Sequence, residues 1–414
     1  MPEVVVVGAG LSGLVCALRL QESGVDVQVL ESSDAVGGRI RTDSVGSFHL
    51  DRGFQVLLDN YPEAKHWLDF DRLELRPFVP GCLVYKRGRF YRLDDPFRSP
   101  TRIGPSLVSP LGSFLDKLRI ARLRYKVTWP SLESVLSRPE MTTREALEND
   151  GFSDEIIKAF FEPFLSGIFL DPDLQTSSRI FHWLFRLFST GLASLPARGM
   201  QAIPDQLAEK IEKGRIRLKT RVVSAEPGQV RLDDGSTIKC RTTVIATDPS
   251  SAAGLLRQPD LTVFNGVTTL YYAVDGRPLT EPILVLNGED DGPVNHLCSP
   301  TEVAREYGPR GSSLLSLSAL GGQEQSDDAL DEAVREQMVP WFGMAVTDWK
   351  LLRIDRIPHA IPSQRPPALS GARKPLRVAD GLFNCGDHTN FASINGAMES
   401  GRLVAEEILA ERDA

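Results

Sequence analysis

The sequence predicts an α/β protein in which helices pack on a parallel sheet. Two observations carry the prediction. Residues 4–7 are a run of valines, typical of a strand buried on both faces, and a glycine-rich turn and an apolar helical pattern follow directly. A second strand pattern closes this unit, and short strand patterns return near the middle and the end of the chain.

The first 31 residues are expected to form one complete β-α-β unit. A strand over 4–7 leads into a helix over 11–23, Gly24 ends that helix, and a second strand over 25–30 follows. Connections of this kind are nearly always right-handed and join parallel strands. The unit predicts a Rossmann-type fold.

The turn and the end of the second strand indicate a bound dinucleotide. Gly8 permits the tight turn, Gly10 lets the backbone approach a pyrophosphate, and Gly13 lets the helix pack closely on the strand. The helix N-terminus offers free N–H groups to the phosphates, and Glu31 can accept hydrogen bonds from ribose hydroxyls. The alternative is an ordinary turn with a solvated acid at a strand end.

The rest of the chain alternates between helical and strand patterns. Residues 76–195 are interrupted by prolines and rich in aromatic side chains, and residues 262–320 are largely β. Helices are predicted over 111–126, 156–170, 179–195, about 327–342 and about 395–411, and strands over 216–218, 221–225, 230–232, 244–247, 267–274, 313–317 and 382–385.

Composition excludes several classes of protein. The chain has 414 residues, 42% hydrophobic and 25% charged, which is typical of a globular protein, and its net charge of −8 argues against nucleic acid as a partner. No stretch reads as a transmembrane helix or a secretory signal. Five scattered cysteines without a CxxC pair indicate reduced thiols, no metal site and a cytoplasmic setting.

Three separated motifs together resemble the flavin amine oxidase superfamily, which includes amine oxidases, protoporphyrinogen oxidases and carotene desaturases. They are the turn of residues 8–14 with Glu31, the run Gly37-Gly38-Arg39, and the C-terminal Gly386-Asp387 followed by residues 393–401. The resemblance covers essentially the whole chain. It implies an FAD-binding domain built from the discontinuous segments 1–75, 196–260 and 356–414, with an inserted α+β substrate domain of 76–195, mainly helical, and 261–355.

Carried over residue by residue, the resemblance implies a set of FAD contacts. Asp387 resembles the acid near the ribityl chain, and Ile394 and Asn395 resemble the residues whose backbone N–H groups face the N1–C2=O edge of the flavin. A helix N-terminus there would stabilise the negative charge of reduced flavin. The implied contacts are Gly8, Gly10, Leu11, Ser12, Gly13, Glu31, Ser32, Gly38, Arg39, Gly53, Phe54, Gln55, Val222, Thr247, Gly386, Asp387, Ser393, Ile394 and Asn395.

The same resemblance bears on the reaction. Ser393 stands where amine-oxidising members carry an aromatic residue, and the strand over 267–274 has no lysine. The run at 386–397 is closer to the carotene desaturases, and no covalent flavin attachment motif is present. We therefore expect non-covalent FAD and C–C dehydrogenation of an apolar, carotenoid- or isoprenoid-like molecule by hydride transfer to flavin N5, with O2 or a quinone as acceptor.

Alternatives stay open at this point. They are an amine or amino-acid oxidase using O2, a porphyrinogen oxidase, and a flavin-binding protein without turnover. No general base is assigned. The candidates for residues beside the flavin ring are Asp51, Phe54, Gln55 and His359.

One segment suggests a peripheral membrane contact. Residues 111–126 combine basic side chains with Phe114 and Leu115, so they would suit an anionic lipid surface into which these residues and Trp183 dip. The alternative is that this helix and the aromatic stretch 156–195 form core, with their arginines solvated.

Overall fold

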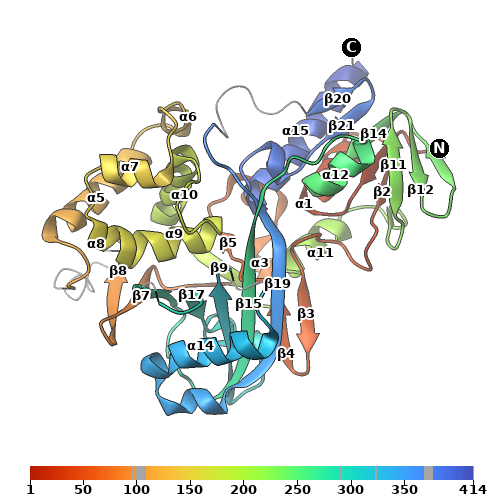
Figure 1. Ribbon diagram of the computed structural model, residues 1–414. Helices are drawn as coiled ribbons and strands as arrows, with labels where there is room; N and C mark the ends of the chain where they lie inside the picture. Colours follow the sequence, from red (N-terminus) through yellow and green to blue (C-terminus); the bar gives the residue numbers. More distant parts are fainter. Residues whose placement is uncertain (96, 99–108, 290, 322–323, 368–375, 414) are drawn as a thin grey trace.

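Two sheets organise the chain, one largely parallel and one mostly antiparallel, and a lobe of helices lies beside them (Figure 1). The computed structural model describes residues 1–95, 97–98, 109–289, 291–321, 324–367 and 376–413. The α/β prediction is confirmed in the first of these sheets.

The parallel sheet has the strand order β10-β2-β1-β14-β21-β20. Its central strand is β1 (Val4–Val7), in which all four valines are buried, and Val4 pairs in parallel with both Val27 and Thr242. The other strands are β2 (Val27–Leu30), β10 (Ile216–Arg217), β14 (Thr242–Ile245), β20 (Arg377–Ala379) and β21 (Leu382–Asn384). The predicted β-α-β unit is therefore present, with helix α1 at Leu11–Glu22.

Helix α15 (Ile394–Asp413) packs closely along α1, so the two ends of the chain meet at the parallel sheet. A Cβ at Gly401 would lie 2.1 Å from the carbonyl oxygen of Ser12, so this contact requires glycine. Helices α11 (Ala202–Glu209) and α12 (Pro249–Leu256) and the small sheet of β11 (Val222–Glu226), β12 (Gln229–Leu232) and β13 (Thr237–Lys239) complete this half.

The second sheet has the order β19-β15-β18-β17-β16-β7-β8. Its long strands β15 (Phe264–Asp275) and β19 (Lys350–Pro362) pair with each other and reach up beside the parallel half (Figure 1). Helix α14 (Asp327–Phe342) packs on this sheet through Leu330, Val334 and Met338. The other strands are β7 (Gly81–Lys86), β8 (Arg89–Asp94), β16 (Leu284–Asn287), β17 (Val294–Cys298) and β18 (Ser312–Ala319).

The helical lobe contains most of the aromatic stretch noted in the sequence. Its helices are α5 (Phe114–Thr128), α6 (Leu132–Leu136), α7 (Thr143–Asn149), α8 (Asp154–Ile156), a π-helical turn at Ile157–Phe161, α9 (Glu162–Phe169) and α10 (Ser178–Thr190). Phe181 and Trp183 on α10 are buried. Of the two interpretations of this stretch, the core interpretation is therefore confirmed for Trp183, which does not dip into a lipid surface.

The helix predicted over 179–195 is too long. It ends at Thr190, because Gly191 adopts an extended backbone and packs against Asn60, where a Cβ would lie 2.3 Å from Asn60 Cγ. The residues that follow form β9 (Ala193–Pro196), which pairs with β5 (Leu57–Leu58) and β6 (Leu75–Pro77).

Several short elements were not anticipated from the sequence. They are the hairpin of β3 (Thr42–Val45) and β4 (Phe48–Asp51), helices α2 (Pro62–Trp67), α3 (Phe70–Leu73) and α13 (Pro300–Val303), and the hairpin of β7 and β8. Strand β19 was also not predicted. It runs across residue 356, where the last segment of the FAD-binding domain was predicted to begin. We propose that the C-terminal segment of the dinucleotide-binding domain begins after Pro362.

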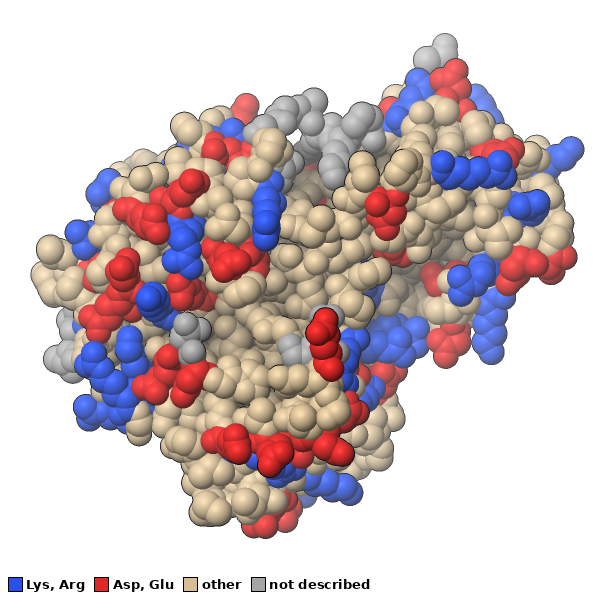
Figure 2. Space-filling model, in the orientation of Figure 1, with Lys and Arg blue, Asp and Glu red and all other residues tan. Residues whose placement is uncertain are grey.

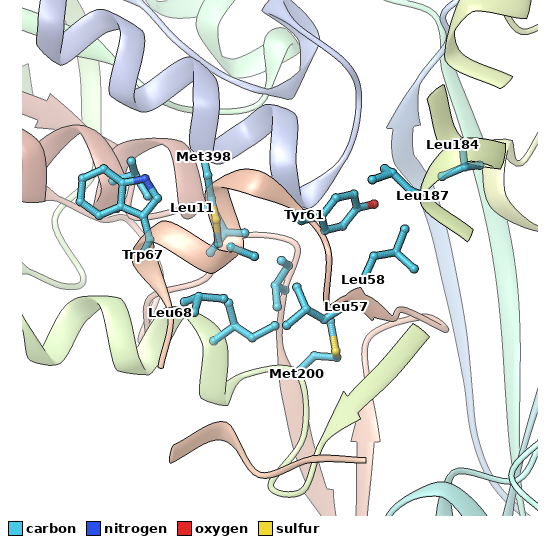
Figure 3. Packing of buried hydrophobic residues seen from close by; sticks show 14 of the residues in the cluster. Leu11, Leu57, Leu58, Tyr61, Trp67, Leu68, Leu184, Leu187, Met200 and Met398 are labelled. Atoms are coloured by element: carbon cyan, nitrogen blue, oxygen red, sulfur yellow. The ribbon is translucent and has the colours of Figure 1, made fainter. Parts of the chain in front are cut away.

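The largest buried cluster joins the α/β half to the helical lobe. Leu11 on α1 and Met398 on α15 lie close to α2, while Tyr61 lies toward Leu184 and Leu187 of α10 (Figure 3). This packing fixes the lobe beside the glycine-rich turn. None of the helices in the described ranges is long and apolar enough to cross a bilayer.

Candidate active site

A cavity of about 970 Å³ extends from the glycine-rich turn to the helical lobe and the antiparallel sheet. Widely separated segments of the chain supply its walls. Of the residues predicted to contact a dinucleotide or flavin, it is lined by Gly8, Gly10, Leu11, Ser12, Glu31, Ser32, Gly38, Arg39, Gly53, Phe54, Gln55, Val222, Thr247, Gly386, Asp387, Ser393 and Ile394.

The three glycines of the turn occupy different surroundings. Gly8 has a φ of +106°, and a Cβ there would lie 2.7 Å from the carbonyl oxygen of Ala246. A Cβ on Gly13 would lie 2.0 Å from Gly8 O, so this glycine sets how closely α1 packs on the sheet. At Gly10 a Cβ would meet nothing within 4 Å. The missing side chain of Gly10 thus leaves room in the cavity, beside the N-terminus of α1.

Glu31 is buried at the end of β2 and faces the same end of the cavity. Its Oε2 accepts a hydrogen bond from the backbone N–H of Ala9, and its Oε1 accepts one from Ser33, both at 2.8 Å. Ser32 Oγ is a third, more distant donor, at 3.5 Å from Oε1. A carboxylate offers about four lone-pair positions, so capacity is left for a further donor. The carboxylate is held where ribose hydroxyls would approach a nucleotide-binding turn.

Arg39 and Asp387 form an ion pair across the cavity wall. Arg39 Nη2 donates to Asp387 Oδ1 at 2.6 Å, and Nη1 donates to the carbonyl oxygen of Ala360 at 3.1 Å. The Asp387 side chain is 8% exposed and that of Arg39 37% exposed. The pair brings together a cation suited to phosphate and an anion suited to hydroxyl groups.

The N-terminus of α15 opens onto the cavity at Ser393 and Ile394. Ser393 Oγ accepts a hydrogen bond from the backbone N–H of Gly396 at 3.0 Å, so Ser393 is the N-cap of the helix. Within the described residues no acceptor is found for the backbone N–H groups of Ile394 and Asn395. These two donors and the helix dipole would favour a partly negative group at this wall.

Four predicted residues lie away from the cavity wall. Gly13 faces the sheet, and the Asn395 side chain accepts a hydrogen bond from the backbone N–H of Glu63. His359 is exposed on β19, with its ring stacked on Phe264. Asp51 is buried and accepts hydrogen bonds from Tyr307 Oη and from the backbone N–H of Met200; burial raises the pKa of its carboxyl group.

The segment after β4 forms another part of the wall. Gln55 Nε2 donates to the carbonyl oxygens of Arg39 and Arg52, at 3.0 and 3.2 Å, and so ties this segment to the Gly-Gly-Arg loop. The Phe54 ring lies 5.4 Å from the ring of His296 on β17. His296 lines the cavity although only 3% of it is exposed, and burial lowers its pKa to about 4.

Beyond these residues the cavity is an apolar chamber. Trp183 lies between two other rings, with its centroid 5.9 Å from Tyr61 and 4.8 Å from Phe391, nearly parallel to both. Side chains from the lobe and from β5 continue this surface: Leu58, Ile168, Phe169, Ile180, Leu184 and Phe188. Among the described lining residues there is no lysine, and the carboxylates are Glu31, Asp248 and Asp387, which follow strands β2, β14 and β21 of the parallel sheet.

Sequence reasoning missed His296 and the role of Trp183 in this chamber. A histidine next to Asn295 within a strand carries no motif, and its position becomes meaningful only when β17 is placed in the sheet. The aromatic pattern of residues 181–188 was visible, but nothing in it indicates which rings face a cavity.

A glycine-rich turn that opens into a largely apolar cavity, with the N-terminus of a second helix in its wall, is typical of an FAD-type oxidoreductase fold. Comparison with known protein families shows which family of oxidoreductases the chain belongs to. The model of the family described as flavin containing amine oxidoreductase matches residues 11–409, and the chain belongs to this family of flavin-dependent enzymes.

Individual relatives differ in their substrates. The chain is 24% identical to coproporphyrinogen III oxidase of Mycobacterium tuberculosis, with 87% of each chain covered. It is also 24% identical to a 15-cis-phytoene desaturase of Capsicum annuum, over 99% of this chain and 78% of that one. An oxidoreductase structure from Methanosarcina mazei superposes with a TM-score of 0.75 at 20% identity, covering 97% of this chain and 99% of the other, which shows the shared fold.

Proposed function

We propose that this protein binds FAD without a covalent bond and dehydrogenates a C–C bond of an apolar molecule of polyene or isoprenoid type. The observation that carries the proposal is the chamber around Trp183, which is apolar and aromatic and, in its described lining, offers no carboxylate or lysine beyond the nucleotide-binding loops. Such a wall would bind an apolar substrate, because binding removes apolar surface of both from water.

The residues at the other end of the cavity fit FAD. The open space at Gly10 would admit a pyrophosphate beside the N-terminus of α1, and Arg39 supplies a guanidinium group there. Glu31 would accept hydrogen bonds from ribose, and the backbone donors of Ile394 and Asn395 would meet an electronegative edge of the ring. When bound, FAD supplies the acceptor for a hydride, at N5. Cys385 is fully buried, which supports non-covalent binding.

The protein's own part in the reaction is to orient the substrate and to exclude water. Tyr61, Trp183 and Phe391 form a stack of nearly parallel rings that lines the cavity with apolar surface, against which an extended apolar chain can lie. Phe54 and His296 form the neighbouring wall. Forming the double bond removes a hydride from one carbon, which the bound flavin would accept, and a proton from the next carbon. The described lining offers no general base for that proton, which would pass to solvent.

A second candidate is the oxidation of a porphyrinogen, favoured by the similarity to a coproporphyrinogen III oxidase over most of both chains. A porphyrinogen carries carboxylates, and Arg52, which is half-exposed, lines the cavity and is paired with Asp43, could bind one in exchange for that partner. Oxidation of an amine finds less support, because an ammonium group would lack a nearby carboxylate in the apolar part of the described lining.

Anaerobic titration of the flavin-loaded protein tests the proposal. Phytoene in detergent, coproporphyrinogen III and putrescine are added separately, and the loss of oxidised-flavin absorbance is followed. We expect phytoene to reduce the flavin and putrescine to leave it oxidised. Reduction by putrescine with peroxide release in air, and none by phytoene, would contradict the proposal. Reoxidation by O2 or by a soluble quinone then identifies the acceptor.

We further propose that α5 contacts a lipid surface, from which an apolar substrate would arrive. Phe114, Leu115, Leu118, Tyr125 and Trp129, at its end, are each more than half exposed. Its basic side chains are largely paired: Arg119 with Asp116, Arg124 with Asp95, and Lys126 with Asp150. The contact would therefore rest on apolar insertion more than on charge.

Charged side chains are spread around the periphery of the face in Figure 2, whereas its centre is mostly uncharged.

No group of three or more His, Cys, Asp and Glu residues in the described ranges could hold a metal ion, and the proposed reaction does not require one.

A further inference from the structure

His296 and Ser318 place two polar groups side by side on the wall of the cavity. They are partners in register on β17 and β18, and both line the cavity while being almost wholly buried. Phe54 lies against the His296 ring, with 5.4 Å between the ring centroids. A few polar groups on a largely apolar wall are the usual means by which such a cavity fixes the orientation of a ligand.

The hydrogen bonds of Asn295 determine which nitrogen of His296 carries the proton. Asn295 Nδ2 lies 2.9 Å from the carbonyl oxygen of Pro163, which can only accept, so the amide nitrogen must face it. Ser166 Oγ donates to Asn295 Oδ1 at 3.0 Å, which supports the same orientation. The amide nitrogen also lies 3.1 Å from His296 Nδ1. Nδ1 therefore accepts, and the proton of the neutral ring is on Nε2.

The ring is also fixed in place. Helix α9 comes so close that a Cβ on Gly167 would lie 2.7 Å from His296 Nδ1, and Phe54 packs on the ring from another side. Among the described residues no acceptor is found for Nε2–H. Burial keeps the ring neutral near pH 7, because its pKa is lowered to about 4. His296 is thus a fixed, neutral hydrogen-bond donor without a partner in an apolar wall.

We propose that His296 Nε2–H binds a neutral oxygen of the substrate, so that among apolar molecules those with a carbonyl, hydroxyl or ether oxygen bind more tightly than pure hydrocarbons. A pure hydrocarbon would leave this buried N–H unpaired, and an ammonium group would oppose one donor to another. Ser318, beside it, can donate a second hydrogen bond to the same oxygen. This inference rests on the proposed function and narrows its substrate class.

Ligand binding to the flavin-loaded full-length protein tests the assignment. The probes are geranylacetone, an isoprenoid ketone, and the hydrocarbon in which its carbonyl is replaced by CH2, and quenching of tryptophan fluorescence reports their binding. We expect the ketone to bind about threefold to tenfold more tightly, the worth of one neutral hydrogen bond.

Two substitutions assign this preference to Nε2–H. His296→Phe keeps an aromatic ring without a donor and should bind both probes about equally. His296→Gln retains a donor at a similar reach and should keep the preference for the ketone. His182→Phe is the control, because His182 is also buried but does not line the cavity, and it should behave as wild type.

Equal affinity of the wild-type protein for ketone and hydrocarbon would overturn the inference without any variant. A preference that persists in flavin-loaded His296→Phe would also overturn it. These outcomes are distinct from failure of the proposed function, which would appear as a wild-type flavin that no polyene, oxygenated or not, reduces under anaerobic conditions.

Discussion

Arg39 Nη2 and Asp387 Oδ1 lie 2.6 Å apart, although the two residues are 348 positions apart in the sequence. Their contact ties the Gly-Gly-Arg loop to the segment that leads into α15, so the first and last parts of the nucleotide-binding half are held together at the cavity. Because the Asp387 side chain is 8% exposed, loss of Arg39 would leave a largely buried carboxyl group without its ion-pair partner.

Replacement of Arg39 by alanine should therefore weaken both the fold and flavin retention. Loss of a hydrogen bond between charged groups costs about 1.5–3 kcal/mol, and we expect the free energy of unfolding to fall by about that amount. Denaturant titration and the flavin content of the purified protein measure the two effects. Arg72→Ala is the matched control, since both members of its pair with Glu209 are more than half exposed. Equal losses in the two variants would contradict the assignment.

Gly10 and Gly13 should respond differently to the same substitution. A valine at position 10 finds open space, so Gly10→Val should fold but be purified colourless, because its side chain would occupy the space proposed for the pyrophosphate. A valine at position 13 would collide with Gly8 O, and Gly13→Val should fail to fold. Circular dichroism and the flavin spectrum distinguish the two defects. A fully yellow Gly10→Val protein would refute the proposed cofactor site.

Ser393→Ala removes the N-cap of the helix that faces the cavity. Loss of such a cap costs about 0.5–2 kcal/mol of stability. We also expect the midpoint potential of the flavin to become more negative, because a frayed helix end would stabilise reduced flavin less well. Ser131→Ala removes the N-cap of α6, whose serine does not line the cavity, and should lower stability alone. An unchanged potential in Ser393→Ala would show that the helix end does not act on the flavin.

His296 should make stability depend on pH. Its pKa is about 4 in the folded protein and near 6.5 when the ring is solvated. Between these values the unfolded chain binds a proton that the folded protein does not, so the free energy of unfolding falls as the pH falls through this window, by up to about 3 kcal/mol. Urea titrations near pH 7 and near pH 4.5 should show a smaller difference for His296→Gln than for wild type. His182 titrates in the same direction and contributes in both proteins.

The parts of the fold that could be predicted are those with local causes. The valine strand, the glycine turn and the helix that follows depend on neighbouring residues, and the predicted helix at 327–342 has the bounds found in the structure. The end of α10 could not be predicted, because Gly191 stops the helix through its contact with Asn60, 131 positions earlier in the chain. Strand β19 is half-exposed along most of its length and carries charged residues, so its pattern does not indicate a strand.

The same distinction applies to the site. Motif positions such as Glu31 and Asp387 could be named in advance, and the structure brings them to one cavity. The orientation of His296 depends on its neighbour Asn295 in β17 and on Pro163 and Gly167 of α9, and these residues share no pattern in the sequence. His359 is the opposite case. Its sequence context predicted a position beside the flavin ring, whereas in the structure it is exposed and stacked on Phe264.

The exposed apolar face of α5 predicts binding to lipid vesicles with little dependence on salt. Its arginines and Lys126 are mostly paired with acids, so screening removes little attraction, whereas Phe114, Leu115 and Leu118 can insert apolar surface. In flotation with phosphatidylcholine vesicles we expect the wild type to bind and the triple serine variant of these residues to bind at least about tenfold less, since each inserted side chain contributes on the order of 1 kcal/mol. Leu261→Ser/Val263→Ser removes exposed apolar side chains elsewhere and should bind as wild type. Binding that requires anionic lipid and vanishes in high salt would instead assign the contact to charge, and a concentration-dependent dimer without flotation would assign the face to a second copy of the chain.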